Sequence, residues 1–114
     1  MSSTVFCLLI DSEKSPVSTL YLVDVGQHVA DLKRDALKET PQEGVGPGDL
    51  RVWRCKDRNA VFTDSDEELL EAQIKEGFSN RNFEVLSPRK AMADLQLSEQ
   101  ETIFLEILGI LYAM

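Results

Sequence analysis

Residues 102–108 constrain the fold of this chain more than any other segment. Their core, Ile-Phe-Leu-Glu-Ile-Leu, is apolar at nearly every position. A strand that faces water on one side alternates apolar and polar residues, whereas a strand buried on both faces reads as a continuous apolar run. We therefore expect Thr102 to Leu108 to form a strand in the middle of a sheet.

The order of the other segments predicts an α+β fold. Thr4 to Ile10 and Thr19 to Val25 are β-rich runs separated by a turn. Residues 28–39 carry apolar side chains at helical spacing, and Leu50 to Cys55 reads as a third strand. With the last strand parallel to the first and the helix packed across a mixed sheet, these pieces build the ubiquitin-like β-grasp topology.

The stretch between the third and the last strand predicts an inserted acidic helix. Residues 65–68, Ser-Asp-Glu-Glu, have capping-box spacing, and Gly77 is placed to end the helix. Phe83 to Leu86 predicts a short strand or extended segment. Pro88 to Leu95 then predicts a short helix with proline in its first turn.

Length and charge narrow the range of functions. A chain of 114 residues fits one domain spanning residues 1–114, and its net charge of −8 disfavours nucleic acid and anionic membranes as partners. No apolar run approaches the ~18 residues of a membrane span, and the N-terminus lacks the pattern of a signal peptide. By these ordinary signals the chain reads as cytoplasmic. Cys7 and Cys55 are too few for a disulfide scaffold or a structural zinc site, so we expect two reduced thiols.

Catalytic and metal-binding patterns are weak. The only histidine, His28, stands beside a predicted helix start, where a capping or solvent-facing role is expected. The glycines of residues 44–48 precede a strand, so this segment is a loop and not a phosphate-binding turn. The acidic residues of 64–71 lack the spacing of a calcium loop. We therefore expect a binding protein, not an enzyme, with no cofactor or metal.

The third strand carries the candidate partner-binding residues. If Leu50 and Val52 face the core, Arg51 and Trp53 lie on the other face of the sheet. Tryptophan and arginine are enriched at binding hot spots. The predicted recognition surface consists of Arg51, Trp53, Arg54 and Lys56. In the alternative interpretation, the insertion at residues 61–86 covers the tryptophan.

Several segments together resemble the N-terminal domain of Crinkler (CRN) effectors, over about residues 5 to 108. They are Phe-Cys-Leu-Leu-Ile near the start, Val29 to Lys33, Leu50 to Lys56, Leu86 to Pro88 with Met92 to Leu95, and Thr102 to Ile107. In the third strand the family pattern L-x-L-F-L-A-K, with Trp common for Phe in fungal members, is met at Leu50, Val52, Trp53 and Lys56. Arg54 and Cys55 depart from it.

This resemblance implies a ubiquitin-like header domain of proteins from oomycetes and fungi. Such headers are thought to serve secretion and delivery into host cells, often without a recognisable signal peptide. Longer family members continue into an effector domain that carries the activity. For this chain, which stops at Met114, the implied role is therefore secretion, translocation and binding to a protein that could belong to the host.

A second resemblance points to an intracellular docking adaptor. The acidic stretch at residues 61–69 is similar to the acidic motif of Phox/Bem-type domains, which are also β-grasp and dimerise when that motif meets a basic face. The alternative docking residues are Asp64, Asp66, Glu67 and Glu68. Against this interpretation, about 25 residues separate the stretch from the last strand, and they contain the match at Leu86 to Pro88.

Overall fold

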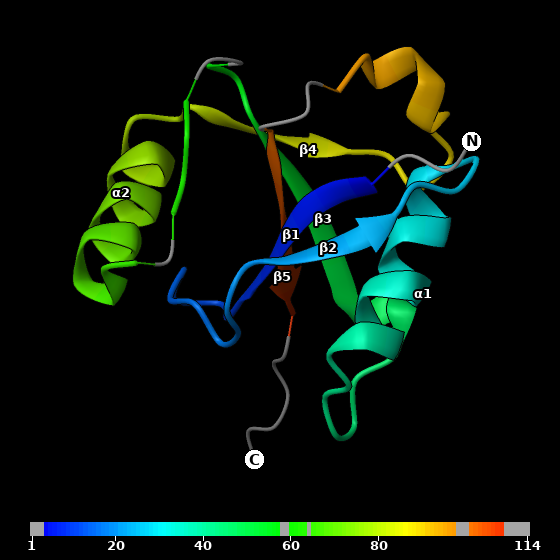
Figure 1. Ribbon diagram of the computed structural model, residues 1–114, viewed down its shortest axis with the longest axis horizontal. Helices are drawn as coiled ribbons and strands as arrows, with labels where there is room; N and C mark the ends of the chain where they lie inside the picture. Colours follow the sequence, from blue (N-terminus) through cyan, green and yellow to red (C-terminus); the bar gives the residue numbers. More distant parts are fainter. Residues whose placement is uncertain (1–3, 58–59, 64, 98–100, 109–114) are drawn as a thin grey trace.

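Five strands and two α-helices make up residues 4–57, 60–63, 65–97 and 101–108, which the computed structural model describes (Figure 1). The strands are β1 (Thr4–Ile10), β2 (Tyr21–Asp24), β3 (Leu50–Cys55), β4 (Phe83–Leu86) and β5 (Thr102–Ile107). The helices are α1 (Val29–Glu39) and α2 (Glu67–Ser79), and two short 3-10 turns are η1 (Pro47–Asp49) and η2 (Met92–Leu95).

The strands form one mixed sheet in the order β2-β1-β5-β3-β4. Strand β5 lies in the centre, parallel to β1 and antiparallel to β3. Residues 102–106 are all buried. The continuous apolar pattern of β5 therefore reflects burial on both faces of the sheet, as predicted. The chain has a β-grasp-like α+β arrangement.

Each face of the sheet is covered by one helix, as Figure 1 shows with α1 and α2 on opposite sides of the strands. On the α1 face, Cys7 and Leu9 of β1 pack in the same core cluster as Leu32. On the α2 face, Leu8 of β1 joins the cluster that contains Leu70. Because successive residues of a strand point to opposite faces, a strand between two cores needs apolar side chains at every position.

Helix α1 follows the amphipathic pattern of its residues, with Leu32 and Ala36 buried against the sheet. His28 occupies its N-cap, in agreement with the sequence-based expectation. The Asp31 carboxylate accepts the His28 N–H at 3.0 Å and the Gln27 N–H at 3.1 Å. This carboxylate accepts hydrogen bonds from backbone N–H groups that precede the helix. The positive end of the helix dipole stabilises its negative charge.

Helix α2 differs from its prediction at both ends. Its N-cap is Asp66, whose carboxylate accepts the Leu69 N–H at 3.1 Å, and not Ser65. The helix also continues through Gly77. A Cβ at Gly77 would lie 2.5 Å from Cε2 of Phe83, so the glycine allows an aromatic ring of β4 to pack directly against the helix. This close packing, and not the predicted end of the helix, explains the glycine at this position.

The predicted helix over Pro88 to Leu95 is wrong except for its last turn, η2. The preceding residues instead serve the start of α1. Val29 N–H donates to the Lys90 carbonyl at 2.9 Å, and Ala30 N–H donates to the Pro88 carbonyl at 3.0 Å. A helix over these residues would use the carbonyls internally, so the cap of α1 and the predicted helix exclude each other.

Candidate functional site

Strand β3 presents alternate residues to the two faces of the sheet, as the sequence predicted. Leu50 and Val52 are buried in the core on the α1 face. Trp53 belongs to the opposite cluster, on the α2 face. Arg51 shares this second face by strand alternation and is exposed.

Arg54 does not belong to the predicted recognition surface. Its exposed fraction is 8%. Its guanidinium forms a bidentate pair with Glu101, with Nε to Oε2 at 2.5 Å and Nη2 to Oε1 at 3.2 Å, and Nη2 also donates to the Leu95 carbonyl at 2.7 Å. Alternation places residue 54 with Val52 and not with Trp53, so its inclusion in one surface with the tryptophan was wrong.

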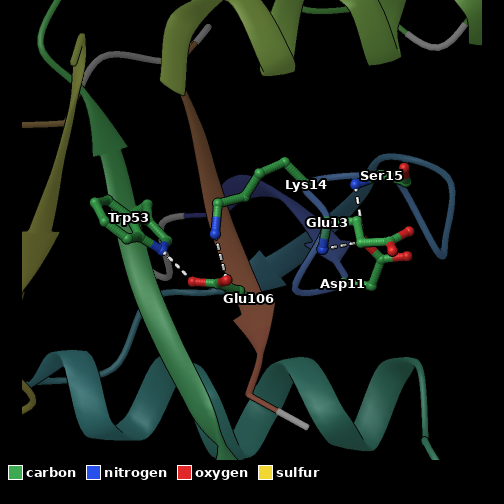
Figure 2. Close-up of polar contacts among 6 residues, drawn as sticks. All are labelled: Asp11, Glu13, Lys14, Ser15, Trp53 and Glu106. Carbon is green, nitrogen blue, oxygen red and sulfur yellow. Dashed lines mark hydrogen bonds and ion pairs between the residues drawn. The ribbon is translucent and has the colours of Figure 1, made fainter. Parts of the chain in front are cut away.

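Trp53 is half-buried because helix α2 covers part of its ring. The Phe78 ring meets the indole edge to face, with 4.9 Å between the ring centroids. The indole Nε1–H donates to Oε1 of Glu106 at 2.9 Å (Figure 2). The insertion at residues 61–86 therefore covers part of the Trp53 side chain, as the alternative interpretation predicted.

The carboxylate of Glu106 is a polar centre that the sequence reading missed. Only 3% of Glu106 is exposed, although the side chain lies in the central strand. Figure 2 shows it between Trp53 and Lys14, whose ammonium forms an ion pair with Oε2. The ammonium also lies 4.9 Å from the Phe78 ring centroid. A single glutamate inside an otherwise apolar strand was the available signal, since a buried carboxylate requires a partner.

The turn after β1 holds Lys14 in position for this contact. Oδ1 of Asp11 accepts the backbone N–H groups of Glu13 at 2.9 Å and Ser15 at 3.0 Å (Figure 2). Lys14 itself adopts a left-handed conformation with φ of 68°. The aspartate thus supplies hydrogen bonds that stabilise a tight turn, and the turn directs the lysine across the sheet.

Exposed cations gather around strand β4. The exposed Lys56 and Arg51 lie on or next to β3, and three further exposed cations stand on the segments that enter and leave β4: Arg81, Arg89 and Lys90. None of the five forms an ion pair with a residue that the structure describes. In contrast, ion pairs engage Lys14, Arg34, Arg54 and Lys75.

An apolar side chain completes this region. Val85 lies opposite Trp53 in the β3–β4 register and is 52% exposed. We refer to Arg51, Trp53, Lys56, Arg81 and Val85 as the β3–β4 corner. Of the four predicted residues, Arg51 and Trp53 share the α2 face with Val85. Lys56 continues the β3–β4 pairing through its bond to Asn82, so alternation turns its side chain to the other face, beside Arg81 at the end of the strand.

The alternative acidic site lies at the start of α2. Glu67 and Glu68 are exposed, as is Asp66, and Leu69 beside them is 56% exposed. Asp64 lies outside the described residues. A groove of about 320 Å³ separates this end of α2 from the segment 16–19 and is lined by Glu67, Leu70 and Glu71 among others. Hydrogen bonds from Lys75 and Ser15 lower the pKa of the Glu71 carboxyl.

The two thiols are protonated at neutral pH, because burial raises the pKa of Cys7 to about 12 and also raises that of Cys55. Within residues 4–57, 60–63, 65–97 and 101–108, no three His, Cys, Asp or Glu side chains are grouped to hold a metal ion. No helix of that part of the chain has the length and apolarity needed to cross a membrane. No protein-family model matches the chain, and no curated protein matches it.

Proposed function

We propose that this chain is a non-catalytic β-grasp binding domain of the Crinkler header type. In this proposal it serves secretion and delivery into host cells and binds a protein partner through the β3–β4 corner. The proposal is carried by the exposed cations of the β3–β4 corner, which form no ion pair with a described residue, in a chain of net charge −8. Exposed cations contribute little to the stability of a fold, because water solvates them equally well in the unfolded chain. Arginine and tryptophan are also enriched at binding hot spots.

The positions of the family-like segments support the proposal. They coincide with structural elements of the β-grasp sheet: β1, the first turn of α1, β3, the end of β4 with η2, and β5. A resemblance scattered over unrelated loops would carry less weight, because a shared fold requires its core segments to match in order. Fold alone does not establish a function, so the delivery role needs a direct test.

The test is a reporter fused to residues 1–114 and expressed in the organism that makes the protein. Appearance of the reporter inside neighbouring host cells is the expected result. The variant Arg51→Glu should reduce delivery or partner capture, whereas Lys38→Glu, an exposed charge reversal on α1, should leave both unchanged. A folded fusion that stays in the producing cell would refute the delivery role.

A second candidate function is intracellular docking through the acidic start of α2. The exposed Leu69 between carboxylates, next to the groove of about 320 Å³, favours this alternative. A basic partner surface with an apolar centre would complement it. Binding through this site should weaken steeply as salt is raised and should be lost in Asp66→Lys, since surface charges act within about 8 Å at physiological ionic strength. Binding that is unchanged by salt and by Asp66→Lys would exclude docking through the start of α2.

A further inference from the structure

Strand β4 is an edge of the sheet, and its hydrogen-bonding phase is defined. Antiparallel neighbours alternate between residue pairs that exchange hydrogen bonds and pairs that do not. Lys56 N–H donates to the Asn82 carbonyl at 2.6 Å, one step beyond the matched pairs of β3 and β4. Counting from this bond, the Trp53–Val85 pair exchanges no hydrogen bonds. The N–H and C=O of Val85 therefore point away from β3, toward the open edge.

The other side of β3 gives the same phase independently. Leu108 N–H donates to the Asp49 carbonyl at 2.8 Å, one step beyond the β3–β5 pairs. The same two-residue period directs the backbone groups of Trp53 toward β5, not β4. Within the described residues, no strand pairs with the outer edge of β4, and no hydrogen bond engages the N–H or C=O of Val85.

The side chains around this edge define what would bind there. Val85 offers exposed apolar surface on the α2 face, next to the indole of Trp53. Arg51 lies on that same face, and Lys56 and Arg81 are exposed near the start of β4. Within β4 itself only Glu84 is acidic. The corner is thus locally cationic although the chain as a whole is strongly anionic.

We propose that β4 accepts an extended peptide segment as a sixth strand, and that this segment carries an apolar residue flanked by acidic ones. The backbone of the segment pairs with the N–H and C=O of Val85. Its apolar side chain packs on Val85 and Trp53, and its carboxylates lie toward Arg51, Lys56 and Arg81. Strand addition takes affinity from main-chain hydrogen bonds and specificity from alternate side chains. This inference rests on the proposed binding function and names the chemistry of the partner.

The experiment titrates the purified 114-residue chain with synthetic heptapeptides and follows backbone amide NMR signals. The probe is Asp-Glu-Val-Ile-Val-Asp-Glu. One control replaces its acids by Lys and Arg, and a second is N-methylated at the central isoleucine, which removes a backbone donor. We expect saturable shifts centred on Val85 and slower hydrogen exchange of the Val85 amide. Because each exposed ion pair contributes a few-fold, the acidic peptide should bind about tenfold tighter than the basic one.

Charge reversal of the corner separates this recognition from general electrostatics. In Arg51→Glu/Lys56→Glu the order of the acidic and basic peptides should invert. The folded spectrum should be retained, because both side chains are exposed and neither forms an ion pair with a described residue. Tighter binding of the basic peptide to the unmodified chain overturns the proposal, as does indifference to N-methylation. Shifts at Leu22 would place the peptide on the opposite edge of the sheet and would also overturn the proposal. Shifts at Val85 that depend on protein concentration without peptide would make a second copy of the chain the occupant, with the same consequence. Failure of the reporter fusion to reach host cells would refute the delivery role and would leave the peptide result unaffected.

Discussion

The buried pair of Arg54 and Glu101 offers the sharpest test of how this fold is held together. The guanidinium reaches both carboxylate oxygens and the Leu95 carbonyl, and Glu101 is only 3% exposed. In the variant Arg54→Met the buried carboxylate loses the guanidinium that reaches both of its oxygens. Breaking a buried pair from one side costs about 3–5 kcal/mol, a large share of the roughly 5–15 kcal/mol that stabilises a small domain.

The expected shift in melting temperature follows from chain length. An unfolding entropy of about 2.1 cal/mol/K per residue gives roughly 0.24 kcal/mol/K for 114 residues. Each kcal/mol then corresponds to about 4 °C, so Arg54→Met should lower Tm by about 12–20 °C. Urea unfolding monitored by circular dichroism measures the same loss at constant temperature.

Two further variants show whether the loss of this pair is the cause. Arg54→Met/Glu101→Leu should recover much of the loss, because an apolar replacement of a whole buried pair is often neutral. Arg51→Met changes an exposed residue of the same strand that forms no ion pair with a described residue, so it should change stability by no more than about 0.5 kcal/mol. A single variant that loses less than about 1 kcal/mol, or a double variant as unstable as the single one, would show that the pair does not have this role.

Three other outcomes are expected from the packing, the cap and the buried thiol. Gly77→Ala should lower stability by about 1 kcal/mol, since overpacking against Phe83 exceeds the gain in helix propensity. The control is Gly48→Ala, whose new methyl group meets open space. Equal urea midpoints for the two variants would contradict this prediction. Asp66→Ala should cost about 1 kcal/mol in thermal unfolding through the lost cap, and an unchanged Tm would argue against it. Because burial raises the pKa of Cys7 from 9.0 to about 12, the unfolded chain loses this proton first, so the stability it contributes below pH 9.0 should disappear as pH rises toward 12. Unfolding across that range should depend less on pH in Cys7→Ala, and identical slopes would exclude the thiol as a contributor.

Much of the fold could be predicted from local patterns, because hydrophobic periodicity and turn residues act over only a few neighbouring positions of the chain. The bounds of β1, β3 and β4 are those predicted, and β5 ends one residue earlier at Ile107. Strand β2 is shorter than the β-rich run of Thr19 to Val25 that predicted it. The errors fell where a local signal competed with a distant contact, as at Gly77, whose missing Cβ serves the ring of Phe83.

The candidate site was predicted in part. Arg51, Trp53 and Lys56 were selected because aromatic and basic side chains share one strand, and the structure places all three at the β3–β4 corner. Val85 was not selected, since an isolated valine in a short segment carries no binding signal until its edge position and exposure are known. Strand alternation alone places Arg54 and Lys56 on the face opposite Trp53, so charge and strand position do not by themselves define one surface.

The sequence by itself determined the β-grasp-like arrangement of one helix across a mixed sheet and the central position of β5. These follow from hydrophobic period and element order, which are local properties of the chain. Only the tertiary structure decided which charges are buried and paired, such as Arg54 with Glu101 and Lys14 with Glu106, and which remain exposed around β4. The reason is that the partners lie 47 and 92 residues apart along the chain, and a pair at that separation depends on sheet register and not on any local pattern.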